Sequence, residues 1–264
     1  MDDVAYFLYE ETAVIGPSAK VAAYSGGGSA SLRATYTTTP FQGITQHKPD
    51  AKYALGANGY FQLPAISLMS EREDGQPGIT CKFFNEPPQS DKRICRDTIQ
   101  ADLSDMLLVD YTHPEINGNI FYMDMTATLK PDQSGEYLFG CSVRGTAKVF
   151  VDGELVVNNA TKQRQGGTFL GAGTLEERGS KHLEAGRTYS ILLQFGSAQT
   201  QTIKKKGATA MRGGGVRLGC DLVRDPQTEI EKAVELAKTC DQVVVCAGLT
   251  VSQSILLTHP ILAY

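Results

Sequence analysis

The sequence predicts a mainly β protein in which an antiparallel β-sandwich is inserted between short segments of an α/β domain. Two observations carry this prediction. Short strands with alternating apolar residues and Gly-rich turns fill the middle of the chain. A short strand near the start, and a helix followed at once by a strand near the end, have the pattern of an α/β fold. The predicted parts are an α/β segment with a Gly-rich loop (1–48), the sandwich (49–222), a helix and strand (223–250) and an unmatched tail (251–264).

The strands of the predicted sandwich show a period of two, which is typical of half-buried strands. Residues 121–129 place Phe121, Met123, Met125, Ala127 and Leu129 on one face. Residues 136–143 and 188–196 continue the pattern, with inward positions at Tyr137, Phe139, Cys141, Val143, Tyr189, Ile191, Leu193 and Phe195. Short strands at this spacing favour a sandwich over a parallel sheet.

A β-hairpin is predicted over residues 149–157. Asp152-Gly153 is a two-residue turn signal of type I′, because both positions need positive φ. The turn pairs Phe150 with Leu155 on one face and Val149 with Val156 on the other. Asp152 is therefore interpreted as a turn former and not as a calcium ligand.

The ends of the chain predict a helix and two strands. Residues 12–19 form a short apolar strand broken at Gly16-Pro17. Further on, Asp225 caps a helix that has Pro226 in its first position. The apolar stripe of this helix is Ile230, Ala233, Val234 and Ala237. The strand that follows, 242–249, would normally lie in a multi-stranded sheet covered on both faces. Because this sequence supplies only a small part of such a sheet, we expect the apolar surface of the strand to be partly exposed and to cause self-association.

Composition and charge exclude several classes of function. The net charge is −4, which gives no reason to expect a nucleic-acid partner, and no apolar run is long enough to span a membrane. Acids near the N-terminus do not fit a secretion signal, so a cytoplasmic location is expected. The six cysteines include no CxxC pair and the four histidines are scattered, so we expect buried free thiols, no metal and no cofactor.

Several segments resemble glycoside hydrolase family 3 β-glucosidases. "AVIGPSAKVAAYSGGGSASL" and "TPFQGI" are similar to the opening of the second, α/β-sandwich domain of that family. "PGITCKFFNEPP", "SGEYLFGCSVRGTAKVFVDGELVVNN", "GTFLGAGTLEERGS" and "LEAGRTYSILLQFGS" resemble the protective-antigen-type β-sandwich that some of these enzymes carry as an insert. The resemblance extends from about residue 12 to 250 and implies the same two folds here.

The resemblance also implies that this chain lacks catalytic residues. In the family, the strand similar to "VVVCAGL" leads to a loop with an acid/base glutamate, whereas this chain continues "TVSQSILLTHPILAY". The family's nucleophilic aspartate belongs to an N-terminal barrel that this sequence does not include. Retaining glycoside hydrolysis needs two carboxyl groups about 5 to 5.5 Å apart. We therefore expect no independent catalysis.

Two segments are candidate binding sites. The resemblance implies that the Gly-rich loop lies near the rim of a sugar pocket, with the candidates Ser25, Gly26, Gly27, Gly28 and Ser29. In "FFNEPP", Phe83 and Phe84 cannot both face one core if the segment is extended, so one ring could stack on a sugar. This adds Phe84, Asn85 and Glu86 as candidates. Glu176 and Glu177 point to opposite faces, and a salt bridge to Arg178 is favoured over acid/base chemistry.

The predicted function is β-glucoside binding associated with a β-glucosidase and shaping of its active-site pocket, without catalysis. One alternative is a repurposed small-molecule-binding protein or a non-hydrolytic catalyst. Another is an interaction partner that completes a barrel-containing glucosidase in trans. A product of gene decay or of an imperfect gene model is the third.

Overall fold

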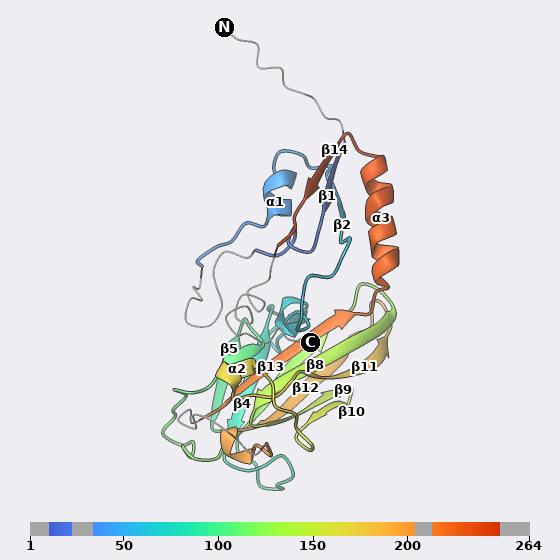
Figure 1. Cartoon of the computed structure of the whole chain (residues 1–264). Coiled ribbons are helices and arrows are strands. Elements are labelled where there is room, and N and C mark those ends of the chain that lie inside the picture. The colour runs from blue at the N-terminus through green and yellow to red at the C-terminus, as the bar shows by residue number, and fades with distance from the viewer. Residues whose placement is uncertain (1–10, 23–33, 204–212, 249–264) are drawn as a thin grey trace. The chain divides into compact units, whose positions relative to one another are not determined.

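The computed structural model describes residues 11–22, 34–203 and 213–248. These residues form two compact units (Figure 1). The first unit combines the described residues up to Phe61 with those from Arg224 onward, and the second extends from Gln62 to Val223. The two units have different folds.

The first unit contains a parallel three-stranded sheet in the order β14-β1-β2. Its strands are β1 (Thr12–Ile15), β2 (Lys52–Ala54) and β14 (Gln242–Val245), and its helices are α1 (Pro40–Thr45) and α3 (Pro226–Lys238). The register aligns Val14 with both Val244 and Tyr53. Because β2 pairs with β1, residues 49–61 belong to this unit, beyond the boundary at residue 48 that the sequence predicted.

Helix α3 begins as predicted. The Asp225 carboxylate accepts a hydrogen bond from the Thr228 backbone N–H at 2.8 Å, and Pro226 occupies the first turn. The apolar stripe is less buried than expected, since Ala233 is buried while Ile230 and Val234 are 44% and 46% exposed. In β14, Val245 is 66% exposed. Self-association through this surface stays a prediction.

The second unit is an antiparallel β-sandwich. Its seven-stranded sheet has the order β10-β9-β12-β7-β4-β5, with β3 pairing beside β7, and its four-stranded sheet has the order β11-β8-β13-β6. The strands are β3 (Ser70–Glu71), β4 (Ile79–Phe84), β5 (Asp97–Ala101), β6 (Asp105–Leu107), β7 (Tyr122–Leu129), β8 (Gly135–Arg144), β9 (Thr146–Val151), β10 (Glu154–Asn159), β11 (Glu177–Leu183), β12 (Tyr189–Gly196) and β13 (Gly215–Leu222). Three short helices, η2 (Ile66–Leu68), α2 (Thr168–Gly171) and η3 (Ala198–Thr200), complete the unit.

The core between the two sheets contains the side chains that the alternating pattern placed inward. Met123, Phe139, Val143 and Leu193 are each fully buried. All six cysteines are free thiols, as expected, and Cys81, Cys141 and Cys220 are buried in the same core. The expected burial is wrong for the other three, because Cys95 is exposed and Cys240 and Cys246 are only partly buried. Burial raises the pKa of Cys81 to about 12, so this thiol stays protonated and unreactive at neutral pH.

The hairpin confirms the predicted turn and corrects one of the predicted pairs. Asp152 and Gly153 have φ of 50° and 78°, and Leu155 pairs with Phe150. Val149, however, pairs with Val157 and not with Val156, because β10 has a β-bulge between Leu155 and Val157. A bulge shifts the strand by one residue and so changes which side chains face outward.

The bulge lies where β10 meets β11 of the other sheet. The Val156 carbonyl oxygen packs against Gly179, where a Cβ atom would overlap it. In the same region, Lys181 donates hydrogen bonds to the Val151 carbonyl and the Glu154 carboxylate, at 3.1 and 2.6 Å. These contacts cover the edge of β10 and close one side of the sandwich.

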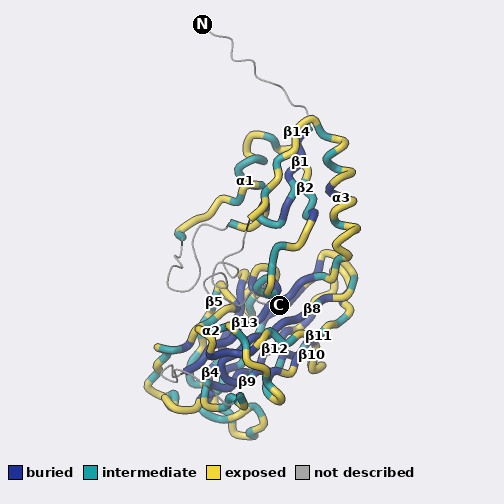
Figure 2. The backbone as a smooth tube through the Cα atoms, in the orientation of Figure 1, coloured by how far each residue is buried: buried dark blue, intermediate teal, exposed yellow. Residues whose placement is uncertain are grey.

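Strands β8 and β13 are buried on both faces, although alternation predicts only one buried face (Figure 2). The segment 62–66 crosses the outer face of their sheet: the Cys220 N–H donates to the Pro64 carbonyl, and Ala65 forms a bridge with Gly219. This covering strip explains why Arg217, which faces away from the core and donates to the Leu63 carbonyl, is only 7% exposed.

The contact between Gly179 and Val156 predicts a position that excludes any side chain. We expect Gly179→Ala to destabilise the protein by about 1 to 3 kcal/mol, because the added methyl group forces the two sheets apart. Urea unfolding followed by far-UV circular dichroism measures the change, since the chain has no tryptophan. Gly118→Ala is the control, because a Cβ atom there meets nothing within 4 Å. Equal midpoints for the two variants would contradict the packing.

The hairpin turn predicts a pH dependence. The Ser190 N–H donates to the Asp152 carboxylate at 2.8 Å, and this bond is the main cause that lowers the pKa of Asp152. A lowered carboxyl pKa contributes stability above the unfolded value of about 3.9, and the contribution disappears as the pH falls through the folded value.

Asp152→Asn keeps a residue that tolerates the turn but removes the charge. We therefore expect the variant to be less stable than the wild type at pH 7 by up to about 1 kcal/mol. The difference should begin to shrink near pH 4 and disappear as the pH falls through the lowered pKa of Asp152 in the folded protein. Thermal unfolding from pH 7 to 3 checks this, and a difference that does not change with pH would exclude the proposed role of the carboxylate.

Candidate functional site

The aromatic residue predicted to stack on a sugar has its ring covered. Phe84 is 8% exposed, and the Arg93 guanidinium lies 3.7 Å from the centre of its ring. Arg93 is held there by two hydrogen bonds to the Asp124 carboxylate, at 2.6 and 3.0 Å. The cation, and not a ligand, therefore occupies the face of the Phe84 ring in this structure.

The neighbouring candidates also have structural partners. The Asn85 amide donates to the Glu115 carbonyl and accepts from the Asn117 N–H, at 2.8 and 2.7 Å. Glu86 accepts a hydrogen bond from the Ile94 N–H, which is the main cause that lowers its pKa. These residues fix the loops that follow β4, and a role in sugar binding stays a prediction. Ser25, Gly26, Gly27, Gly28 and Ser29 lie outside the described residues.

Glu176 forms a buried charged cluster. Its carboxylate accepts hydrogen bonds from Arg217 at 3.1 Å, from Arg178 at 2.7 Å and from the Leu63 N–H at 3.1 Å. Arg217 in turn donates to the Leu63 carbonyl. The favoured salt bridge between Glu176 and Arg178 is therefore present, and Arg217 is a partner that the sequence pattern did not indicate.

Among the described residues of the sandwich, the most unusual backbone lies in residues 163–175, which we call the strained loop. Phe169 and Leu170 both have positive φ, with φ and ψ of 52° and 51° for Phe169 and of 57° and 40° for Leu170. The left-handed region costs roughly 1 to 2 kcal/mol for a residue with a side chain. Two such residues in succession persist only where their surroundings hold them.

Hydrogen bonds along both sides of the strained loop provide that restraint. The Gly166 N–H donates to the Gly173 carbonyl and the Gly173 N–H to the Thr168 carbonyl, at 3.0 and 2.9 Å. The Thr168 hydroxyl donates to the Thr174 carbonyl at 2.9 Å. At the base, Arg164 makes two hydrogen bonds with Glu177, and these raise the pKa of Arg164.

The base of the loop is also fixed to the four-stranded sheet. Thr174 exchanges hydrogen bonds with Val143 of β8, and the fully buried Asn159 amide donates to the Thr174 hydroxyl at 2.8 Å. The Gln163 amide donates to the Gly145 carbonyl at 2.8 Å. The loop is thus held in place before any ligand arrives.

The tip of the strained loop presents apolar surface. Leu170 is 75% exposed, while the Phe169 ring is half-buried against Gly215, where a Cβ atom would overlap it. The tip offers apolar contact and has no group that transfers a proton. The sequence signal that could have indicated it is an apolar Phe-Leu pair between glycines in "GGTFLGAG", which periodicity does not detect.

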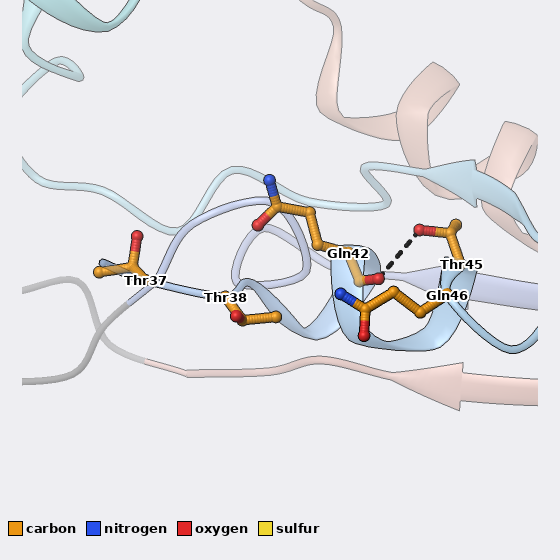
Figure 3. A pocket seen from close by; sticks show the side chains of 5 residues that line it. All are labelled: Thr37, Thr38, Gln42, Thr45 and Gln46. Carbon is orange, nitrogen blue, oxygen red and sulfur yellow. Dashed lines mark hydrogen bonds between the residues drawn. The ribbon is translucent and has the colours of Figure 1, made fainter. Parts of the chain in front are cut away.

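The first unit has a second candidate, an open depression of about 390 Å³ (Figure 3). It is lined by the polar side chains of Thr37, Thr38, Gln42, Thr45 and Gln46. Gln42 is engaged in the capping box of α1, and the Thr45 hydroxyl donates to the Phe41 and Gln42 carbonyls. Because these groups already satisfy the short helix, the depression is the weaker candidate.

Among the described residues, no three His, Cys, Asp or Glu side chains are grouped so that they could hold a metal ion. None of the helices in the described ranges has the length and apolar character needed to cross a membrane.

Comparisons with known proteins give the family. Residues 75–221, which include the strained loop, match the model of the PA14 domain. The probable beta-glucosidase I of Neosartorya fischeri is 44% identical over 238 residues, which cover 90% of this chain and 28% of that protein. The probable beta-glucosidase I of Emericella nidulans is 44% identical over 251 residues, covering 94% and 30%.

A solved structure agrees. The crystal structure of a beta-glucosidase from Kluyveromyces marxianus in complex with glucose has a TM-score of 0.83 at 27% identity, covering 92% of this chain and 29% of that one. The chain spans less than a third of the length of these relatives. Because the matched segment makes up more than half of its residues, this chain belongs to the PA14 domain family.

Proposed function

We propose that this chain is the part of a β-glucosidase-like protein that contacts the glycoside and shapes its binding pocket, without hydrolysing it. The observation that carries the proposal is the strained loop, with two consecutive non-glycine residues at positive φ. Backbone strain of this kind is concentrated at ligand-binding and active sites. The loop lies within the residues matched by the PA14 model.

The chemistry of the loop tip supports a glycoside as the ligand. A pyranose ring has an apolar C–H face, and a side chain such as Leu170 gains free energy when that face covers it. Leu170 is 75% exposed, so its apolar surface is available for such a contact. The relatives named as beta-glucosidases, one of them solved with glucose, point to the same class of ligand.

We assign no catalytic role to the carboxylates beside the strained loop. The carboxylates that follow the strained loop are Glu176 and Glu177, and both are committed to arginines. Their side chains are only 6% and 23% exposed. Retaining hydrolysis needs a nucleophilic carboxylate and an acid/base carboxyl on either side of the glycosidic bond. Glu176 and Glu177 are adjacent residues, each held by an arginine, and do not face each other across a space for that bond.

The backbone strain at Leu170 predicts the effect of a glycine substitution. Leu170→Gly removes the left-handed penalty, so we expect an increase in stability of about 0.5 to 1 kcal/mol after the added freedom of the unfolded chain is subtracted. Leu103→Gly is the matched control, because Leu103 is an exposed leucine without positive φ and should lose stability. Urea midpoints measure both changes. A loss of stability in Leu170→Gly would show that the loop is not strained.

Binding and turnover test the function. We expect the chain to bind glucose and cellobiose with millimolar Kd by titration calorimetry, and Leu170→Ala to weaken binding about threefold or more. Leu103→Ala should bind like the wild type.

No release of chromophore from a chromogenic β-glucoside is expected above buffer. Flat titrations of the wild type would remove the binding role, and ordinary enzyme kinetics would refute the absence of catalysis.

A further inference from the structure

The outer face of the seven-stranded sheet carries two rows of side chains that differ in character. Strand register aligns Leu155 of β10, Phe150 of β9 and Leu192 of β12 in an apolar row. Two positions further along each strand of β9 and β12, a polar row consists of Asn158, Lys148 and Gln194. Val149 and Leu193, which lie between the rows, point into the core and are fully buried.

The β-bulge in β10 brings the two rows into line. In a regular strand, an outward Leu155 would place Val157 outward and Asn158 inward, because side chains alternate. With the bulge, Val157 is 2% exposed and Asn158 is exposed beside Lys148. Bulges of this kind re-aim side chains, often beside functional sites.

The polar row contains hydrogen-bonding groups that the protein does not use. Across the described residues, neither the Lys148 nor the Gln194 side chain has a hydrogen-bond or ion-pair partner, although both are partly buried. Their neighbours along the same row are already neutralised. Asp124 is paired with Arg93 at 2.6 Å and Lys82 with Glu73 at 2.7 Å.

This arrangement fits a neutral sugar chain better than a charged one. Each pyranose unit combines an apolar ring face with hydroxyl groups along its rim, which matches an apolar row next to a row of amine and amide donors. Adjacent strands lie about 4.8 Å apart, an interval close to the length of one sugar ring. Lys148 is the single uncompensated charge of the two rows, so a polyanion would form few ion pairs on this surface.

We propose that the outer face of β10, β9 and β12 binds a neutral oligosaccharide of several linked pyranose units. This surface is separate from the strained loop, which packs on the four-stranded sheet through Thr174 and Phe169. The inference rests on the proposed function for the class of ligand and adds a second contact surface. The protein would hold an extended glycan on one layer of the sandwich while the loop contacts a glycoside on the other.

Calorimetric titration with cellohexaose tests the surface. We expect the double variant Lys148→Ala, Gln194→Ala to bind cellohexaose about tenfold more weakly than the wild type, because it loses both free donors. The matched control is Lys130→Ala, Gln133→Ala, the same residue types in the exposed turn after β7, with unchanged binding. Circular dichroism and urea midpoints establish that both variants are folded.

The outcomes separate this inference from the proposed function. Equal binding of cellohexaose by the wild type and the Lys148→Ala, Gln194→Ala variant overturns the surface and leaves the loop in place, provided that Leu170→Ala binds cellobiose more weakly. No binding of any saccharide by the wild type overturns both proposals. Tighter binding of tri-galacturonic acid than of cellohexaose overturns the assignment to a neutral ligand.

Discussion

The sandwich depends on the buried ion pair between Glu176 and Arg217, because this pair fixes the strip of chain that covers the four-stranded sheet. Leu63 has its N–H bonded to Glu176 and its carbonyl bonded to Arg217, so one ion pair satisfies both backbone groups of a fully buried residue. Leaving either charge without its partner in such a site costs about 3 to 5 kcal/mol. The pair therefore specifies where segment 62–66 lies.

The same pair connects the covering strip to the strained loop. Glu176 follows the last residue of that loop, so the ion pair holds the point where the loop returns to β11. The strain at Phe169 and Leu170 is offset by the hydrogen bonds of Thr174 with Val143 and Asn159. A rigid base under a strained tip is the arrangement expected of a preorganised contact surface, because the cost of ordering the loop is met before binding.

Local patterns in the sequence predicted the parts of the fold that local physics decides. Alternation identified the inward side chains of β7, β8 and β12, because period two follows directly from strand geometry. Asp152-Gly153 and Asp225-Pro226 predicted a turn and a helix start through backbone preferences of those residues alone. The bulge at Val156, the second buried face of β8 and the partner of Glu176 each depend on segments distant in sequence, and no local pattern contains them. The strained loop was missed for a different reason, since Phe169 and Leu170 adopt the conformation that their side chains least favour.

The outer faces of the two sheets differ in how their polar groups find partners. The four-stranded sheet carries buried arginines and glycines outward, so it needs the covering strip and the loop base to satisfy its charges and fill its space. On the seven-stranded sheet, Asp124 and Lys82 of the polar row are paired in place with Arg93 and Glu73, and Lys148 is left without a partner among the described residues. The unused donors of the seven-stranded sheet, those of Lys148 and Gln194, lie on the strands themselves. The outer face of the four-stranded sheet is covered, so a ligand there would meet the covering segments and not the strands. On the two proposals, one layer would contact a ligand through a loop tip and the other through the strands themselves.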